Sequence, residues 1–363
     1  MCRDIKSSRQ EQSGLTLVEL LISAVIASVM AAAMLQGLAA STHSEFVRDQ
    51  LAGMQEASRY AFHVIADEVR MAGYMGCMDA TSNGLRLVKT PEQSNADINR
   101  YLIRENNNIN PLIFERTALF DVLIEGVEGN ASGPISLENW AEKTPILIGP
   151  KMASASDALI VQRADYEGAV VTATELGQVH TENATIRASD VALVTDCLTT
   201  DMFYVAGTEN KSLQFNDTDN TSSSLQHFSK TGNLTSYRFQ GKVFFIGYVN
   251  DDPQGTPALF ALDLLDPQGG KEIVAEGIEN MQVQYGLHAD NGLLYVSAHE
   301  LHAQANPYVS TVKITLMIRT LREVANKDTL KSHDLNGTTI QTNDRYARSI
   351  LSETIKIRNR RLI

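Results

Sequence analysis

A single carboxylate, Glu19, lies inside a long apolar run that otherwise carries no formal charge. From Leu15 to Ser44 the chain consists mostly of Leu, Val, Ile, Ala and Met, and this run is long enough to cross a bilayer core as a helix. A carboxylate at the centre of a spanning helix costs about 2.5–3.5 kcal/mol on insertion scales. We therefore expect Glu19 to have a function and to need a partner of opposite charge.

The segment before this run indicates where the partner comes from. Residues 1–14 are polar and charged, and they end at Gly14, directly before the first apolar residue. Cleavage after Gly14 makes Leu15 a new amino terminus. Its amine and Glu19 are four positions apart, close to the roughly 3.6 residues of one helical turn, so both groups share a face at a similar membrane depth.

The stretch Gly14-Leu15-Thr16-Leu17-Val18-Glu19-Leu20-Leu21-Ile22 resembles the class III signal of type IV prepilins and type II secretion pseudopilins. The resemblance implies that a prepilin peptidase cleaves between Gly14 and Leu15 and methylates the Leu15 amine. The first mature residue of this family is usually Phe or Met, and here it is Leu. The resemblance also implies that Glu19, at the fifth mature position, neutralises the N-terminal amine of a neighbouring subunit during assembly.

Two other interpretations of the same stretch compete with this one. An ordinary secretory signal also places charges before an apolar core, with a cut at Ala31-Ala32-Ala33 or at Leu38-Ala39-Ala40, but its core has only about 7–15 residues. A plain signal anchor explains the apolar span. It leaves the spacing from Gly14 to Glu19 without a reason, and the pilin interpretation explains both.

Composition places the rest of the chain among ordinary globular proteins. Hydrophobic residues make up 43% and charged residues 20% of the 363 residues, enough for a sizeable core. The net charge is −12, and loss of the three basic and two acidic residues of 1–14 takes it to −13. Nucleic acid is not an expected partner of so acidic a chain.

The cysteines predict one disulfide. Cys2 leaves with the leader, so Cys77 and Cys197 remain as an even pair in an exported domain, where disulfides form. The alternative is two buried free thiols. A bridge closes a loop of about 120 residues, for which the chain-entropy model gives about 4–5 kcal/mol.

Beyond the apolar run, the sequence predicts that the helix continues to about Ala72 and ends at Gly73. No proline occurs between the run and Pro91. Apolar side chains recur with the helical period. The stripe consists of Val47, Leu51, Met54, Ala57, Ala61, Val64, Ile65, Glu68 and Ala72. A rod of about 85 Å is longer than a membrane needs, so its second half must pack on something, and a C-terminal sheet is the candidate.

We expect an α+β fold with four regions: a leader (1–14), a long helix (15–73, with a transmembrane half at about 15–40), a turn-rich connection (74–154) and a β-rich domain (155–363). Apolar and polar residues alternate in 281–287 and 312–319, which is typical of half-buried antiparallel strands. Asp290-Asn291-Gly292 predicts a hairpin turn. The helix is expected to pack on this mainly antiparallel, pilin-like domain.

No motif points to catalysis or to a cofactor. In Ala298-His299-Glu300-Leu301-His302 the histidines are three apart, whereas the metalloprotease helix places them four apart, so a solvated or hydrogen-bonded loop is the better interpretation. Asn216, Asp217 and Asp219 could hold calcium, but the loop lacks the glycine and distal glutamate of an EF-hand. We expect no metal site, no cofactor and no enzymatic activity.

The later sequence resembles the PilW type of minor pilin. Tyr74-Met75-Gly76-Cys77, directly after the helix, resembles the junction of that family, and Asp196-Cys197-Leu198, Val283-Gln284-Tyr285-Gly286 and the basic ending from Ile357 to Arg361 resemble it more loosely. The resemblance implies a structural minor pilin that helps to initiate type IV pilus assembly, near the tip. A minor pseudopilin of a type II secretion system and a membrane-anchored periplasmic enzyme are the alternatives.

The same resemblance implies the partners and the location. The partners are other major and minor pilins, the prepilin peptidase, the inner-membrane pilus assembly machinery and the lipid bilayer. The chain is expected in the bacterial inner membrane, with one span and a periplasmic C-terminal domain, and in the extracellular pilus.

The position of the mature terminus is the first testable consequence. Removal of 14 of the 363 residues leaves a protein of 349 residues that begins at methylated Leu15. Intact-mass measurement and N-terminal sequencing of the membrane-extracted protein check this. A terminus at Met1, Met34 or Ser41 contradicts it.

Overall fold

The computed structural model describes only part of the chain. The described residues are 16–77, 85–87, 102–105, 108–111, 124–127, 153, 155–183, 185–197, 200–216, 225, 233–263, 271–289, 292–302 and 309–358. They form two compact units, 1–52 and 53–363, and the helix α1 (Leu17–Arg70) contributes residues to both. One long N-terminal helix and a β-rich, mainly antiparallel domain confirm the α+β class.

The last turns of α1 pack through a face that only partly coincides with the predicted stripe: Met54, Ala61, Ile65 and Glu68 are buried as predicted, whereas the predicted members Val47, Leu51, Ala57 and Val64 are only partly buried. Within the second unit, eight side chains of the helix are buried: Met54, Ser58, Ala61, Phe62, Ile65, Ala66, Glu68 and Val69. The helix ends at Arg70, and Gly73 follows with a φ of 74° while its N–H donates to the carbonyl of Gln162 at 2.9 Å. A left-handed glycine after a helix is a common stop, because glycine has no Cβ to clash there.

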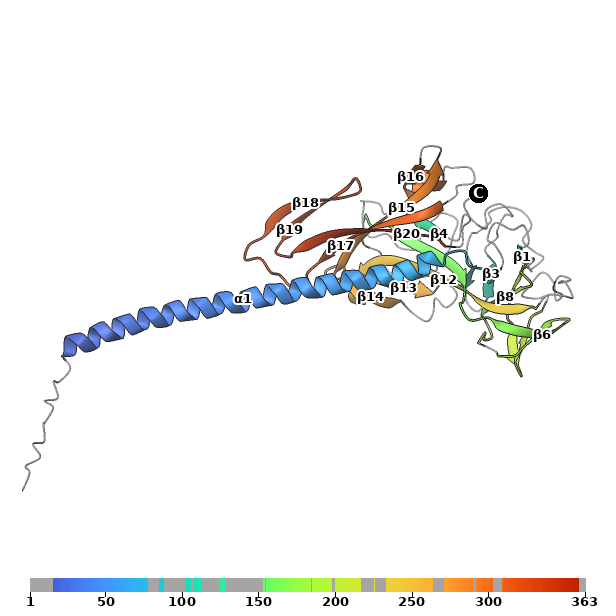
Figure 1. Ribbon diagram of the computed structural model, residues 1–363, viewed down its shortest axis with the longest axis horizontal. Coiled ribbons are helices and arrows are strands. Elements are labelled where there is room, and N and C mark those ends of the chain that lie inside the picture. The colour runs from blue at the N-terminus through green and yellow to red at the C-terminus, as the bar shows by residue number, and fades with distance from the viewer. Residues whose placement is uncertain are drawn as a thin grey trace, which may run out of the picture. The chain divides into compact units, whose positions relative to one another are not determined.

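The larger sheet is built around one long strand. Its path runs β1-β9-β8-β12-β6-β7-β11-β10, with β5 and β13 also paired to β12, β4 paired to β5, and β14 paired to β13. All of these pairs are antiparallel except β1 with β9. The strand bounds are β1 Leu85–Leu87, β4 Ile124–Val127, β5 Ala158–Ala164, β6 Ala169–Glu175, β7 Gln178–Thr181, β8 Val191–Thr195, β9 Thr200–Tyr204, β10 Gly207–Glu209, β11 Ser212–Gln214, β12 Thr235–Tyr248, β13 Pro257–Asp263 and β14 Glu272–Glu276. Figure 1 shows β12 beside the last turns of α1.

A second sheet has four antiparallel strands in the order β16-β15-β17-β20. The strands are β15 (Ile278–Ala289), β16 (Gly292–Val296), β17 (Val309–Arg319) and β20 (Arg348–Lys356). The predicted alternation is confirmed in 281–287, where Met281 and Val283 are buried and Gln282 and Gln284 are partly exposed. In β17 the half-buried prediction was wrong, because Thr315 and Met317 on the other face are only 1% and 2% exposed. Ala289 pairs with Gly292, so the predicted hairpin joins β15 to β16, although residues 290 and 291 lie outside the described residues.

Several short elements were not predicted from the sequence. Two further sheets are two-stranded: β2 (Leu102–Glu105) with β3 (Asn108–Pro111), and β18 (Thr329–Leu335) with β19 (Thr338–Asp344). A 3-10 turn, η2, covers Val249–Asp251, and a one-turn helix, α2, covers Ala298–His302 where the sequence favoured a loop. The N–H of Ser297 donates to the Glu300 carboxylate at 2.9 Å and the N–H of Glu300 donates to the Ser297 hydroxyl at 3.3 Å, a reciprocal cap that starts a helix.

The hairpin β18–β19 lies on the four-stranded sheet and is held at both ends. Near its turn, the Asn336 amide donates to the Thr315 hydroxyl at 2.7 Å. At its base, the guanidinium of Arg348 donates to both carboxylate oxygens of Asp344 and of Glu279, at 2.6–2.9 Å. Arg319 adds a 3.3 Å ion pair to Glu279. A two-stranded hairpin is marginal alone, so these contacts supply much of its stability.

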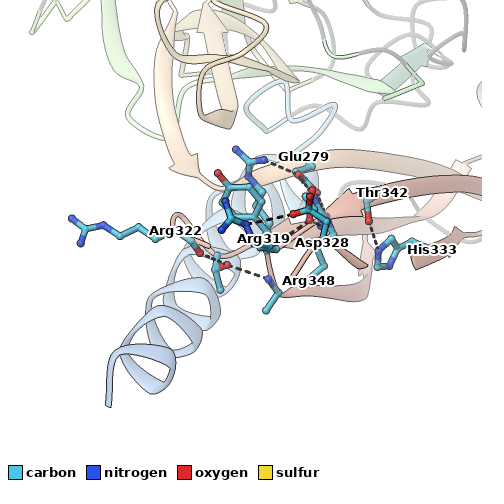
Figure 2. Close-up of polar contacts among 12 residues, drawn as sticks. Glu279, Arg319, Arg322, Asp328, His333, Thr342 and Arg348 are labelled. Atoms are coloured by element: carbon cyan, nitrogen blue, oxygen red, sulfur yellow. Dashed lines mark hydrogen bonds and ion pairs between the residues drawn. The ribbon is translucent and has the colours of Figure 1, made fainter. Parts of the chain in front are cut away.

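The ionic cluster formed by Arg348, Asp344, Glu279 and Arg319 is largely shielded from water. The side chain of Arg348 is 3% exposed and that of Glu279 is 14% exposed. The cluster and the neighbouring contact between the His333 ring and the Thr342 hydroxyl, 3.2 Å long, can be followed in Figure 2. Hydrogen bonds from Arg348 lower the pKa of Asp344 below its ordinary value of 3.8, against a smaller opposing effect of burial.

Asp344→Asn should change how stability depends on pH. A carboxylate with a lowered pKa contributes fully above its unfolded value of 3.8, and the contribution disappears as the pH falls through the lowered folded value. We expect the variant to be less stable than the wild type at neutral pH and to lose less stability below about pH 4. Chemical unfolding of the full chain in detergent, followed by circular dichroism between about pH 7 and pH 2.5, measures this.

Asp328→Asn is the matched control. Its carboxylate is 65% exposed and pairs with Arg345 at the surface, where ion pairs contribute little. An acid dependence altered equally by both substitutions contradicts the role assigned to Asp344.

Candidate functional site

The start of α1 is a reciprocal cap in which Glu19 takes part. The helix begins at Leu17, so Thr16 is its N-cap residue and Glu19 its third residue. The Glu19 N–H donates to the Thr16 hydroxyl at 3.3 Å, and the Thr16 N–H donates to the Glu19 carboxylate at 3.0 Å. The Thr16 hydroxyl donates to the same carboxylate oxygen, Oε2, at 3.0 Å. Two backbone N–H groups that the helix itself cannot satisfy are thus paired.

The cap leaves the carboxylate able to meet another donor. Both hydrogen bonds use Oε2, and the described residues place no donor on Oε1. The carboxylate is thereby held in one place on the helix, because it is fixed through Thr16. A cation that approaches Oε1 meets a positioned negative charge, and no reorganisation of a free side chain is required.

The surface around Glu19 is apolar and open. The large side chains of the first turns are more than half exposed, among them Leu17, Val18, Leu20, Leu21 and Ile22. The Ser23 hydroxyl donates to the Glu19 carbonyl at 2.7 Å, which removes a polar group from that surface. By length and composition α1 is apolar enough to cross a membrane, with a mean hydropathy of 2.3 in its most apolar window and none of that window buried.

Several of the other predicted site residues lie outside the part of the chain that the structure describes. Gly14 and Leu15, the predicted cleavage site, lie outside the described residues, and so do Asp217 and Asp219 of the candidate calcium loop. His302 and His299 fall in α2, but their side chains are not described. Among the described residues, no cluster of three or more His, Cys, Asp or Glu side chains has the arrangement of a metal site.

Cys77 and Cys197 form a disulfide, the pair that the cysteine count pointed to. Their Cα atoms lie 4.9 Å apart, and 120 positions separate them in the sequence. The bridge joins the end of α1 to the turn after β8. Just before it, Gly76 has a φ of 81°, and a Cβ at this position would lie 2.5 Å from the ring of Tyr237. The junction therefore depends on a glycine for both its backbone conformation and its space.

A buried ionic cluster between the last turns of α1 and the larger sheet was not predicted from the sequence. Glu68 of α1 receives two hydrogen bonds from the guanidinium of Arg163 in β5, at 2.6 and 3.3 Å. The ammonium of Lys242 in β12 donates to the same carboxylate at 2.6 Å. The side chains of Glu68 and Arg163 are only 10% and 6% exposed. The signal was present, since Glu68 was the one charge in the predicted apolar stripe, but its partners lie far away in sequence.

Opposing effects set the protonation of Glu68. Burial by itself raises the pKa of a carboxyl, because the charged form loses its hydration. Hydrogen bonds and charges from Arg163 and Lys242 outweigh burial, and the pKa of Glu68 lies below its ordinary 4.5. Glu68 is therefore ionised at neutral pH and fixes α1 to two neighbouring strands of the larger sheet.

Two family models match the chain, one near each end. The model described as type IV pilus-assembly protein W matches residues 246–359, and the model described as prokaryotic N-terminal methylation motif matches residues 9–35. No match was found among curated proteins or among solved structures. Together the two matches support a PilW-type pilin, and both families are structural components of pilus assembly rather than enzymes.

Glu68→Ala should strongly destabilise the second unit. The substitution leaves Arg163 buried without its carboxylate, and breaking a buried ion pair from one side costs about 3–5 kcal/mol. Thermal or chemical unfolding of the full chain in detergent, with the disulfide intact, measures the loss.

The control for this prediction is Asp67→Ala, one residue earlier on the same helix. Asp67 makes only exposed pairs, to Arg70 at 3.2 Å and to His63 at 3.5 Å, and such pairs contribute about 0–1 kcal/mol. Equal losses of unfolding free energy for the two variants would show that the buried cluster stabilises the second unit no more than the exposed pairs of Asp67 do.

Proposed function

We propose that this chain, supported as a PilW-type pilin by both family matches, is a minor pilin that is held in the inner membrane and then built into a type IV pilus. A prepilin peptidase removes residues 1–14 and methylates Leu15, and the C-terminal domain lies in the periplasm before assembly. The subunit helps to start the filament and occupies a place at or near its tip.

The observation that carries the proposal is a capped carboxylate at the start of an exposed apolar helix. In a filament whose helices pack together, Glu19 loses contact with water and needs a cation. No Lys or Arg occurs between Leu15 and Ser44, so the chain's own spanning segment offers none. The N-terminal amine of a neighbouring pilin, at the same depth, is the group that fits.

Pairing between subunits is compatible with the cap. Thr16 already occupies Oε2 of Glu19, and an incoming amine is expected at Oε1. The cap keeps the first turn helical while the charge is unpaired in the membrane. When the subunit docks, the Glu19 carboxylate forms an ion pair with the amine of the neighbouring subunit.

The match to a pilus-assembly family favours the pilus over a type II secretion system. The pseudopilin alternative shares the whole N-terminal signal. Identification of the proteins that copurify with the detergent-extracted chain separates the two, since pilus subunits are expected in one case and secretion components in the other.

Two substitutions at Glu19 separate charge pairing from helix capping. Glu19→Ala removes both roles, whereas Glu19→Gln keeps an acceptor for the Thr16 N–H and removes the charge, because glutamine also serves in this cap. In a strain lacking the wild-type protein, we expect both variants to be inserted and cleaved normally. We expect their amount in sheared pili to fall about tenfold or more, the effect of losing roughly 1.4 kcal/mol in docking.

Glu45→Ala is the matched control, since Glu45 is an exposed acid further along the same helix. It should leave incorporation unchanged. If Glu19→Gln is incorporated as well as the wild type and only Glu19→Ala fails, Glu19 acts as a cap and not as a charge partner.

A further inference from the structure

The four-stranded sheet ends in a long strand, β20, that has an open edge. Its nine residues pair with β17 from Arg348 opposite Arg319 to Lys356 opposite Thr311, without any break in register. Within the part of the chain that the structure describes, no strand pairs with the other side of β20. Such an edge presents a row of backbone donors and acceptors to its surroundings.

Hydrogen bonds at both ends of β20 show which backbone groups face outward. The Ile357 N–H donates to the Ser310 carbonyl, and the Ala347 carbonyl accepts from the Thr320 N–H, so the odd-numbered residues face β17. Neighbouring residues of a strand point their N–H and C=O groups in opposite directions. Ile350, Ser352, Thr354 and Lys356 therefore present theirs to the open side.

Exposed apolar side chains flank this edge on both faces of the sheet. Ile350 is 36% exposed and Leu351 is 37% exposed. Their partners in β17, Met317 and Leu316, are 2% and 0% exposed. Because successive side chains lie on opposite faces, a strand added to β20 covers one apolar side chain on each face.

Three of the other described edges, β14, β16 and β10, carry features that discourage pairing, whereas the seven-residue strands β18 and β19 pair regularly and, among the described residues, are also open on their outer sides. The edge strand β14 has a register break in its pairing at Leu259 and Phe260, and glutamates at both of its ends. The edge strands β16 and β10 have only five and three residues. Irregular, charged or short edges are the usual protection against unwanted pairing. The β20 edge also has charged residues at its ends, Arg348 and Lys356, but it is longer than β14, β16 and β10, has no break in register and is uncharged from Ser349 to Ser352.

We propose that the open edge of β20 receives an extended segment of a neighbouring pilin, which adds to the sheet as a further strand. The chemistry of the edge calls for a backbone in β conformation, with apolar side chains opposite Ile350 and Leu351 and an acidic residue toward the exposed Lys356 and Arg358. The inference rests on the proposed function, because it takes the partner to be another pilus subunit.

The end of the edge supports this choice of partner. The Arg358 N–H, the next outward donor after β20, bonds to the carbonyl of Arg70, the last residue of α1, at 3.0 Å. The open edge is thus continuous with the helix through which the proposed filament packs.

A proline at an outward position tests the edge without disturbing the sheet. Thr354 is exposed and its N–H faces outward, so Thr354→Pro removes a donor from the edge but none from the ladder with β17. In the full chain, expressed in cells that assemble the pilus, we expect normal membrane levels and at least about fivefold less copurification of partner pilins, the effect of one lost hydrogen bond. Thr354→Ala, which keeps the N–H, should match the wild type.

A second variant and a crosslinking experiment test the same edge in case Thr354→Pro fails to fold. If Thr354→Pro lowers the amount of folded protein, Ile350→Lys places a charge on the same edge and should give the same loss of partners. A photo-crosslinking amino acid at Thr354 should capture another pilin, whereas the same probe at Ile273 on the broken edge of β14 should not.

The outcomes distinguish this inference from the function on which it rests. Wild-type protein that never enters sheared pili contradicts the proposed function. Wild-type protein that does enter them, with normal copurification by both edge variants or with crosslinks only to proteins other than pilins, overturns the β20 inference alone.

Discussion

The position of α1 on the larger sheet depends on the neutralisation of one buried carboxylate, that of Glu68. Glu68 points from α1 into the larger sheet, where Arg163 and Lys242 meet it from two adjacent strands. Apolar packing along the stripe of α1 supplies most of the burial but allows the helix to slide or rotate by small amounts, because apolar contact is not directional. A charge pair that is costly to break from one side allows much less freedom. The disulfide between Cys77 and Cys197 then fixes the chain as it leaves the helix.

Two carboxylates on the same helix have contrasting surroundings. Glu68 has its full set of partners within its own chain, so it serves the stability of the domain. Glu19 lies on an exposed apolar surface and has only a local cap, to Thr16. A charge that is expensive in an apolar environment and incompletely paired within one chain is a natural contact for a second chain. The helix thus carries one acid that serves folding, Glu68, and one that we propose serves assembly, Glu19.

Two parts of the four-stranded sheet differ in how they are covered. In the four-stranded sheet, the hairpin β18–β19 is attached to one region by the cluster of Arg348, Glu279 and Asp344, while the edge of β20 stays open. The charged cluster lies at the Arg348 end of β20, and the four residues that follow it, Ser349 to Ser352, are uncharged. This separation is consistent with an edge that pairs with another chain, because buried ion pairs give specificity and an open ladder gives a generic backbone contact.

The sequence by itself determined the features that depend on neighbours along the chain. The apolar run, part of the buried face of α1 (Met54, Ala61 and Ile65), the alternating strand around Val283 and the α+β class all follow from local periodicity. The cap of Glu19 by Thr16 and the turn at Asn336-Gly337 between β18 and β19 are also local patterns, and both were overlooked although their signals are in the sequence. Only the tertiary structure decided that Glu68 meets Arg163 and Lys242, that Arg348 joins Glu279 to Asp344, and that β20 ends its sheet with an open side. The physical reason is that, apart from Arg348 with Asp344, these contacts join residues tens to more than a hundred positions apart. The order of strands in a sheet, unlike the alternation within one strand, also leaves no periodic pattern in the sequence.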